Sequence, residues 1–227
     1  SVLALIFIRD NPASCDLAPD GETYNPLEEI SSGQISVRLK DARRSLVFWV
    51  YSLSLAMHAL FGTALTFHVV AIFSEAGLSK EVAFSYFIPV AIFSTSANLL
   101  ASWLVDSSSL KPFLILMLGS FILGSVGFIF LNAAWGYWAL ALGFGVGGGL
   151  WGVISNLAFI RFFGPSHVGE VSGFSTSISV FASALGPFVF SAAADIFGSY
   201  GAAAQTCLFL LLVLLVAAAL IPQKELS

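Results

Sequence analysis

The chain has 227 residues, of which 58% are hydrophobic and 10% are charged, whereas an average soluble domain has about 25% charged residues. A soluble fold of this length cannot bury so much apolar surface, because small proteins keep a large share of their surface exposed. The net charge is −4, few residues are charged, and the sequence contains no basic run. We therefore expect no nucleic-acid partner. We therefore expect an integral membrane protein whose main partner is the lipid bilayer.

The first segment, "SVLALIFI" at residues 1–8, is apolar but too short to cross a membrane, since a crossing needs about 20 residues. We expect it to be the tail of a preceding transmembrane helix. Residues 9–44 are polar and are predicted to form a cytoplasmic linker, with an amphipathic helix in "QISVRLKDARRS" lying on the inner leaflet. Asn11-Pro12-Ala13 matches the pore tripeptide of water channels, but no second copy follows, so we interpret it as a turn.

Six long apolar runs follow the linker, and each is long enough to span the bilayer. They lack the alternation that barrel strands show, so the predicted fold is an all-α membrane protein. We expect a six-helix transmembrane bundle over residues 45–221 and a cytoplasmic tail over residues 222–227. The predicted spans are Ser45–Phe73, Val82–Val105, Pro112–Asn132, Trp135–Phe163, Val168–Phe197 and Gly201–Ile221.

The basic residues predict the orientation of this bundle. Eight of the nine Lys and Arg residues fall on the same side of the predicted spans, namely Arg9, Arg38, Lys40, Arg43, Arg44, Lys111, Arg161 and Lys224. Lys80 alone falls on the other side. Because cytoplasmic loops are enriched in Lys and Arg, we expect both ends of the chain to lie in the cytoplasm.

Three stretches resemble the second half of a major facilitator superfamily transporter, and within it the bacterial monocarboxylate and oxalate–formate transporter-like group. They are "FIRDNPASCDLAPDGE", "ASWLVDSSSLKP" and "RFFGPSHVGEVSGF". The resemblance implies half of a twelve-helix bundle, made of two three-helix inverted repeats, with an N-terminal six-helix half that is missing here. It further implies that the first, second, fourth and fifth spans line a central cavity, with the third and sixth outside.

The same resemblance implies a function. It is that of a secondary active transporter, not an enzyme, which moves a small solute by alternating access, as symport or antiport. H⁺ is the candidate coupling ion, no cofactor is expected, and the location is the bacterial cytoplasmic membrane. The alternative from a different class is a six-helix channel or pore subunit.

The candidate substrate-binding residues are polar or aromatic side chains inside the spans: His58, Thr66, Asn98, Trp151, Asn156 and Ser179. His58 lies near the middle of the first span, where a charge costs about 2.5–3.5 kcal/mol on insertion scales, so we expect a neutral ring. Gly62 and Thr66 follow at four-residue spacing and share its helix face. A contact to substrate and a hydrogen bond between helices both remain open for His58.

Packing is the competing interpretation for the other candidates. Asn98 and Asn156 are amides that need partners when buried. Trp151 can stack on a solute, but the surrounding "GFGVGGGLWG" is typical of close helix packing. Ser179 belongs to a serine row on the fifth span, which either packs against a neighbour or lines a wet cavity.

Four charged residues at the predicted inner ends are gating candidates: Asp106, Lys111, Arg161 and Glu170. We expect Asp106 to pair with Arg161 or Lys111 as a conformational latch, the alternative being an ordinary solvated surface. The second and fifth spans contain no Lys or Arg. Either the substrate is not a small carboxylate, or the counter-charge lies in the missing half. The sequence shows no metal-binding or enzyme motif.

Overall fold

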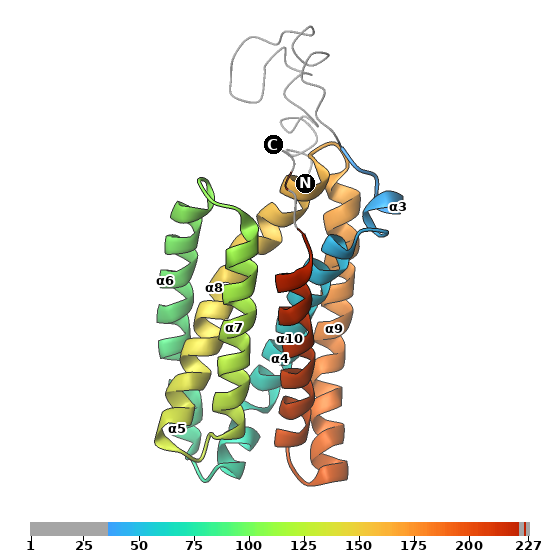
Figure 1. Cartoon of the computed structure of the whole chain (residues 1–227). Helices are drawn as coiled ribbons and strands as arrows, with labels where there is room; N and C mark the ends of the chain where they lie inside the picture. Colours follow the sequence, from blue (N-terminus) through green and yellow to red (C-terminus); the bar gives the residue numbers. More distant parts are fainter. Residues whose placement is uncertain (1–35, 223–224, 226–227) are drawn as a thin grey trace, which may run out of the picture. The chain divides into compact units, whose positions relative to one another are not determined.

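The computed structural model of this chain describes residues 36–222 and residue 225. Its helices are α3 (Leu39–Ala42), α4 (Leu46–Glu75), α5 (Lys80–Ser85), α6 (Phe87–Val105), α7 (Leu110–Ile129), α8 (Ala134–Phe163), α9 (Val168–Phe197) and α10 (Gly201–Leu220) (Figure 1). The predicted helix tail at residues 1–8, the Asn-Pro-Ala tripeptide and the linker as far as residue 35 lie outside the described residues.

The six predicted spans are confirmed. Six segments are long and apolar enough to cross a membrane when α5 and α6 are taken together. An α-helix suits this setting because it satisfies its own backbone hydrogen bonds. The largest difference from the prediction is at the end of the third span, which stops at Ile129, because the chain turns there, and not at Asn132.

The second span is interrupted at Tyr86, between α5 and α6. Proline has no backbone N–H, so Pro89 cannot donate the bond that would continue the helix from Ser85. This local break divides the second span into the short helix α5 and the longer helix α6. It also places Tyr86, whose exposure is 2%, in the packed interior.

Specific residues mark where the helices begin and end. The Ser45 hydroxyl accepts a hydrogen bond from the Val47 amide at 3.2 Å and so caps the start of α4. Gly164 and Gly198 end α8 and α9 with φ values of 80° and 71°. A side chain at either position would be strained, which is why helices commonly end on glycine.

Helix pairing shows how the bundle is built. Helix α4 packs along α9, helix α6 packs along α8, and α7 packs against α8. The first three spans, α4, α6 and α7, correspond in order to the last three, α8, α9 and α10. When each helix is replaced by its counterpart, the α4–α9 pair becomes the α8–α6 pair. The packing therefore has the pairing that two related three-helix repeats require. Helix α10 contacts α7 and α4 and joins the two groups (Figure 1).

Glycines allow the backbones of these helices to approach closely. A Cβ added at Gly143 on α8 would lie 2.3 Å from the Gly124 nitrogen on α7. On another face of α8, a Cβ at Gly149 would lie 2.3 Å from the Ser94 carbonyl oxygen on α6. The "GFGVGGG" segment is thus a two-sided packing surface, as small residues at membrane helix interfaces commonly are.

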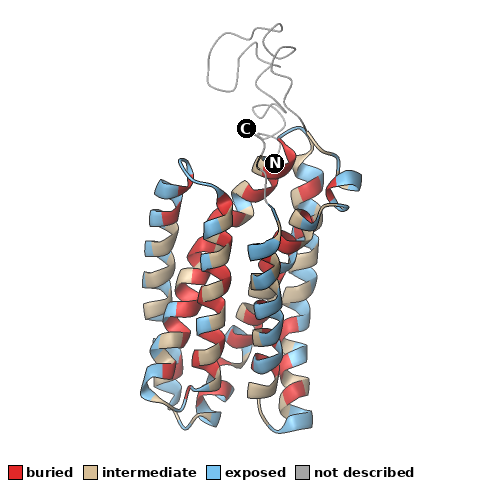
Figure 2. Ribbon diagram, viewed as in Figure 1, coloured by how far each residue is buried: buried red, intermediate tan, exposed pale blue. Residues whose placement is uncertain are grey.

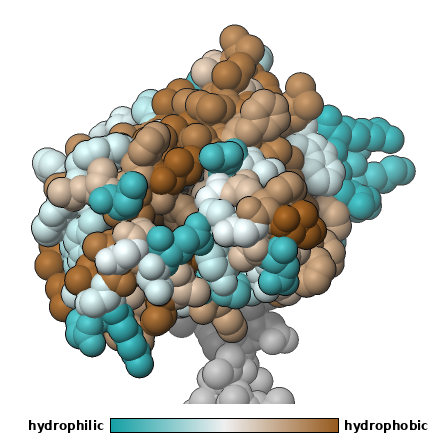
Figure 3. All heavy atoms as spheres, turned by 90° about the horizontal axis from the view of Figure 1, so that it is seen from below, coloured by the Kyte–Doolittle hydropathy of each residue, from teal (hydrophilic) through white to brown (hydrophobic). Residues whose placement is uncertain are grey.

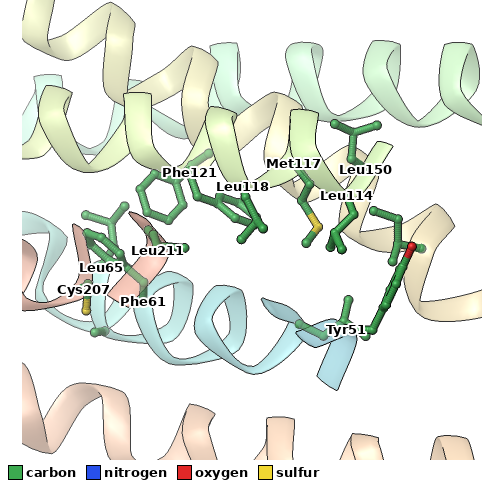
Figure 4. Close-up of a cluster of buried hydrophobic side chains, with 14 of the residues drawn as sticks. Tyr51, Phe61, Leu65, Leu114, Met117, Leu118, Phe121, Leu150, Cys207 and Leu211 are labelled. Atoms are coloured by element: carbon green, nitrogen blue, oxygen red, sulfur yellow. The ribbon is translucent and has the colours of Figure 1, made fainter. Parts of the chain in front are cut away.

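The interior is filled by aromatic and aliphatic side chains from several helices (Figure 4). The Phe61 ring on α4 contacts the rings of Phe144 at 4.8 Å, Phe190 at 5.3 Å and Phe128 at 5.8 Å between centroids. These partners come from α8, α9 and α7, so one buried phenylalanine joins four helices. Aromatic pairs at such distances add to the stabilisation that burial provides.

Burial is uneven among the spans (Figure 2). Within the described bundle, we compare an 18-residue apolar stretch of each span. In the span formed by α5 and α6, 11% of this stretch is buried, and in α9 17%, compared with 50% in α7. The resemblance implies that the third span, α7, lies outside the cavity. Within this half α7 is nevertheless well buried, because α8 and α10 both pack on it. The faces of α6 and α9 are the ones left uncovered.

The end of the predicted linker docks on the bundle. The Val37 amide donates to the Phe163 carbonyl at 2.7 Å, at the end of α8, and the Trp49 indole N–H donates to the Arg43 carbonyl at 2.7 Å. Of the described residues in the predicted amphipathic helix, those from residue 36 on, only Leu39–Ala42 is helical, so this part is shorter than expected. Ala42 is fully buried, so this segment is anchored to the protein.

Candidate functional site

His58 lies in an aromatic setting where α4, α7 and α8 meet. Its ring stacks on Phe121 of α7, with centroids 4.9 Å apart and planes at 15°, and lies tilted against Trp151 of α8 at 5.3 Å. Its Nδ1 atom is buried and has no hydrogen-bond partner among the described residues. An unpaired buried polar atom is costly, so His58 has hydrogen-bonding capacity that this arrangement does not use.

A pocket of about 390 Å³ opens beside His58, between α4, α6 and α8. We call it the α4 pocket. It is lined by His58, Ala59, Gly62, Thr63, Leu65, Thr66, Phe67, Tyr86, Phe87, Val90 and Phe144. This volume lies in the range of small-molecule sites. None of these lining residues is charged.

The polar groups of the α4 pocket are mostly already bonded within the protein. The Thr66 hydroxyl donates to the Gly62 carbonyl at 2.8 Å, and the Thr63 and Ser183 hydroxyls bond at 2.7 Å across α4 and α9. Among the lining residues, His58 is the one with a buried side-chain polar atom that has no hydrogen-bond partner within the described part of the chain. The structure therefore brings two predicted site residues, His58 and Thr66, to one pocket.

The other predicted binding residues do not line this pocket. Asn98 donates to the Gly149 carbonyl on α8 at 3.0 Å, so it joins α6 to α8. The Trp151 indole donates to the Leu55 carbonyl on α4 at 3.3 Å while its ring contacts His58. Asn156 is exposed and donates to Gly152 of its own helix at 2.9 Å. Ser179 is half-buried on α9.

Sequence reasoning missed several pocket residues. Tyr86 and Phe87 lie at the helix break, and Phe144 lies on the opposite helix. Aromatic residues in apolar spans give no periodic signal that separates a pocket from the core. Thr63 follows His58 by five residues, about 140° around the helix, so helical spacing gives no signal for it either.

The second histidine, His68, has a structural role. Its Nε2 lies 3.1 Å from the Pro187 carbonyl oxygen on α9, and its ring lies 5.1 Å from that of Tyr200. Since a carbonyl only accepts, Nε2 carries the proton and donates. His68 thus joins α4 to α9 near the proline of that helix.

The predicted pairing of Asp106 with Arg161 or Lys111 is not found in this structure. Arg161 donates to the Val105 and Ser108 carbonyls, each at 2.8 Å, and pairs with Glu225 at 3.4 Å. Asp106 is exposed at the end of α6. Arg161 is bound elsewhere because the carbonyls at the end of α6 and in the loop that follows it attract a cation.

The other gating candidates are likewise at helix ends. Lys111 donates to the Ala219 and Ile221 carbonyls at 2.7 and 3.2 Å, at the end of α10. Glu225 accepts from the Leu110 amide at 2.6 Å, at the start of α7. Glu170 is exposed in the first turn of α9. The network of Arg161, Lys111 and Glu225 holds the ends of α6, α7, α8 and α10 together. We call it the inner-end caps, after the side on which the sequence predicts these ends to lie.

Comparison with known proteins identifies the family. The family model described as Major Facilitator Superfamily matches residues 1–187. A search of curated proteins gave no significant match. The family consists of secondary transporters and not of enzymes, and their partners are a small solute and the membrane. With six candidate spans and a match over most of its length, this chain belongs to the major facilitator superfamily.

Proposed function

We propose that this chain forms the second half of a secondary active transporter and moves a small solute by alternating access. The observation that carries the proposal is the α4 pocket, which lies between spans that pair as two repeats within a chain of this family. In transporters built from repeats, the substrate site lies between them near the middle of the membrane.

The uncovered helices support a partner half. Large apolar side chains are exposed on both α6 and α9, such as Trp103 at 76% and Phe188 at 70%. Lipid covers part of such a surface in a membrane protein. A six-helix N-terminal half placed against α6 and α9 would cover the remainder and would enclose the α4 pocket from its open side.

We propose that both ends of the chain are cytoplasmic. Among the described residues, Arg38, Lys40, Arg43, Arg44, Lys111 and Arg161 lie at the end of the bundle that carries α3, and Lys80 lies at the end that carries α5 (Figure 1). Cytoplasmic ends are the basic ones. Seen from the α5 end, hydrophilic residues are interspersed with hydrophobic ones (Figure 3).

The mechanism follows from rigid packing. The inner-end caps and the glycine contacts of α8 hold this half together, so it moves as a body. Rocking of one such half against the other opens the site alternately to each side. Coupling to H⁺ is assigned to the imidazole of His58, which lines the pocket, or to a carboxylate of the other half.

The test is transport by the full-length protein reconstituted in liposomes. Counterflow is measured across a panel of neutral, anionic and cationic solutes, with and without a pH gradient. A carrier gives saturable uptake that is stimulated by the same solute on the opposite side. Unsaturable uptake without such stimulation would support the channel alternative and would overturn the carrier proposal.

A further inference from the structure

The α4 pocket also indicates what kind of solute it accepts. We propose that the part of the solute bound there is uncharged and aromatic, and carries one hydrogen-bonding group that meets His58. This inference rests on the proposed transport function and adds a substrate class to it.

The first support is the absence of fixed charge near the pocket. Within the described bundle, the Lys, Arg, Asp and Glu residues from Leu46 to Leu220 all lie at helix ends or between helices: Glu75, Lys80, Glu81, Asp106, Lys111, Arg161, Glu170 and Asp195. Glu75 is the charged residue nearest to His58 along α4, roughly 25 Å away at the usual helical rise. An anion or cation placed beside His58 would have no counter-charge from this part of the chain.

The second support is the chemistry of the walls. Four of the lining residues are aromatic: Phe67, Tyr86, Phe87 and Phe144. Of these, Phe67 is 74% and Phe87 37% exposed, so their rings are free to contact a bound solute. Aromatic rings bind one another edge to face or offset stacked. A planar ring therefore finds partners in this pocket that a flexible polar solute does not.

The third support is that one polar group stands out. The hydroxyls of Thr63 and Thr66 are already bonded within the protein. His58 is held in place by its stacking on Phe121 and by Trp151, and its side chain makes no hydrogen bond to the described residues. A neutral imidazole offers one donor and one acceptor. A single hydroxyl or N–H on the solute is enough to complement it.

The test uses two probes that share one ring system, indole and indole-3-carboxylate. Thr66 is exposed and lines the pocket, so Thr66→Cys is placed in full-length protein whose other cysteines are replaced. The rate of alkylation by a maleimide is measured with increasing probe. We expect indole to slow the reaction, and indole-3-carboxylate to need at least about tenfold more for the same effect, because an unpaired charge is disfavoured in an apolar site.

Matched variants locate the site. A Cβ at Gly62 would lie at ordinary contact distance, 3.6 Å from His58 Cε1, whereas at Gly119 on α7 nothing lies within 4 Å. Gly62→Val places a side chain in the pocket without a backbone clash. The space for indole is then smaller, so protection by indole should weaken about tenfold. Gly119→Val should not change it. Ser74→Cys, farther along α4 and outside the pocket, should not be protected.

Each outcome decides the proposal. Protection by indole that is lost in Gly62→Val and absent at Ser74→Cys supports it. Equal or better protection by the carboxylate, no protection by either probe, or protection that Gly62→Val leaves unchanged overturns it. Saturable counterflow together with equal protection by indole and indole-3-carboxylate would leave the transport function standing while the substrate class fails. Failure of counterflow for every solute would instead overturn the proposed function itself.

Discussion

His58 and Phe121 stack face to face, with ring centroids 4.9 Å apart and planes inclined by 15°. This contact joins α4 to α7, and Trp151 of α8 completes the surroundings of the imidazole. The ring position is therefore set by packing, while its nitrogens are left for other partners. The sequence leaves packing and solute binding as alternative roles of His58. In the structure the flat face of its ring serves packing, and its nitrogens can serve binding.

Replacement of His58 by phenylalanine tests this separation. The phenyl ring keeps the stack on Phe121, so the free energy of unfolding should change by less than about 1.5 kcal/mol, as for shape-conserving core changes. Loss of the nitrogens removes one hydrogen bond to solute, and binding should weaken about 2- to 13-fold, the equivalent of 0.5–1.5 kcal/mol. Thermal unfolding and solute protection of Thr66→Cys measure the two effects.

Two controls accompany this variant. His58→Ala removes both the stack and the nitrogens, so it should lower stability as well as binding. His68→Gln keeps an N–H that can reach the Pro187 carbonyl, so transport should persist with its pH dependence unchanged. If His58→Phe binds solute and responds to pH as the unmodified protein does, His58 has only a packing role.

Close packing between α7 and α8 predicts a strong position dependence for glycine substitutions. Gly143→Ala places a methyl group 2.3 Å from the Gly124 backbone, which cannot move aside as a side chain can. We expect a loss of about 1–3 kcal/mol, the usual cost of overpacking. Gly119→Ala on α7 meets nothing within 4 Å and should be near neutral. Thermal unfolding in detergent compares the two, and equal effects would contradict the packing described here.

The bond between Thr63 and Ser183 predicts a difference between two threonines on α4. Thr63→Val breaks a contact to α9, whereas Thr66→Val breaks a bond within α4 itself. Hydrogen bonds between membrane helices average about 0.6 kcal/mol, so Thr63→Val should be destabilising by that amount and Thr66→Val less. Ser183→Ala should match Thr63→Val, and the double variant should cost no more than either alone.

The six spans could be predicted from the sequence because the apolar runs are long and bounded by Gly, Ser and charged residues. The helix break at Tyr86 follows from Pro89, which the sequence alone shows. Helix pairing was not predictable from composition. It depends on which glycine face of α8 meets which neighbour, and all faces of that helix look equally apolar.

The sequence predicts the site only in part. His58 stands out as an ionisable residue in an apolar run, and Thr66 follows from helical spacing. The inner-end partners of Arg161 could not be found, because carbonyl oxygens carry no sequence identity. Glu225 lies in a short tail whose place in space the sequence does not specify. Charge complementarity in the sequence therefore points to Asp106 and not to these partners.

The inner-end caps predict which charges matter for stability. Arg161→Gln removes charged bonds to the Val105 and Ser108 carbonyls, and hydrogen bonds to charged groups contribute about 1.5–3 kcal/mol. We expect a loss of about 2 kcal/mol in thermal unfolding. Arg161→Lys keeps the charge but not the two-pronged geometry, so it should recover only part of the loss. Full recovery would show that charge alone is sufficient.

The last prediction sets Glu225 against Asp106 as the residue that biases the inner face. Glu225 bonds both the start of α7 and Arg161, while Asp106 is exposed. An exposed charge is worth little, so Asp106→Asn should change the conformational distribution less than Glu225→Gln does. Spin labels at Ser107 and at the inner end of the other half report this distribution as distances. A larger shift in Asp106→Asn would show that a latch through Asp106 forms in another conformation, and that the caps on Arg161 hold this half together without controlling its movement.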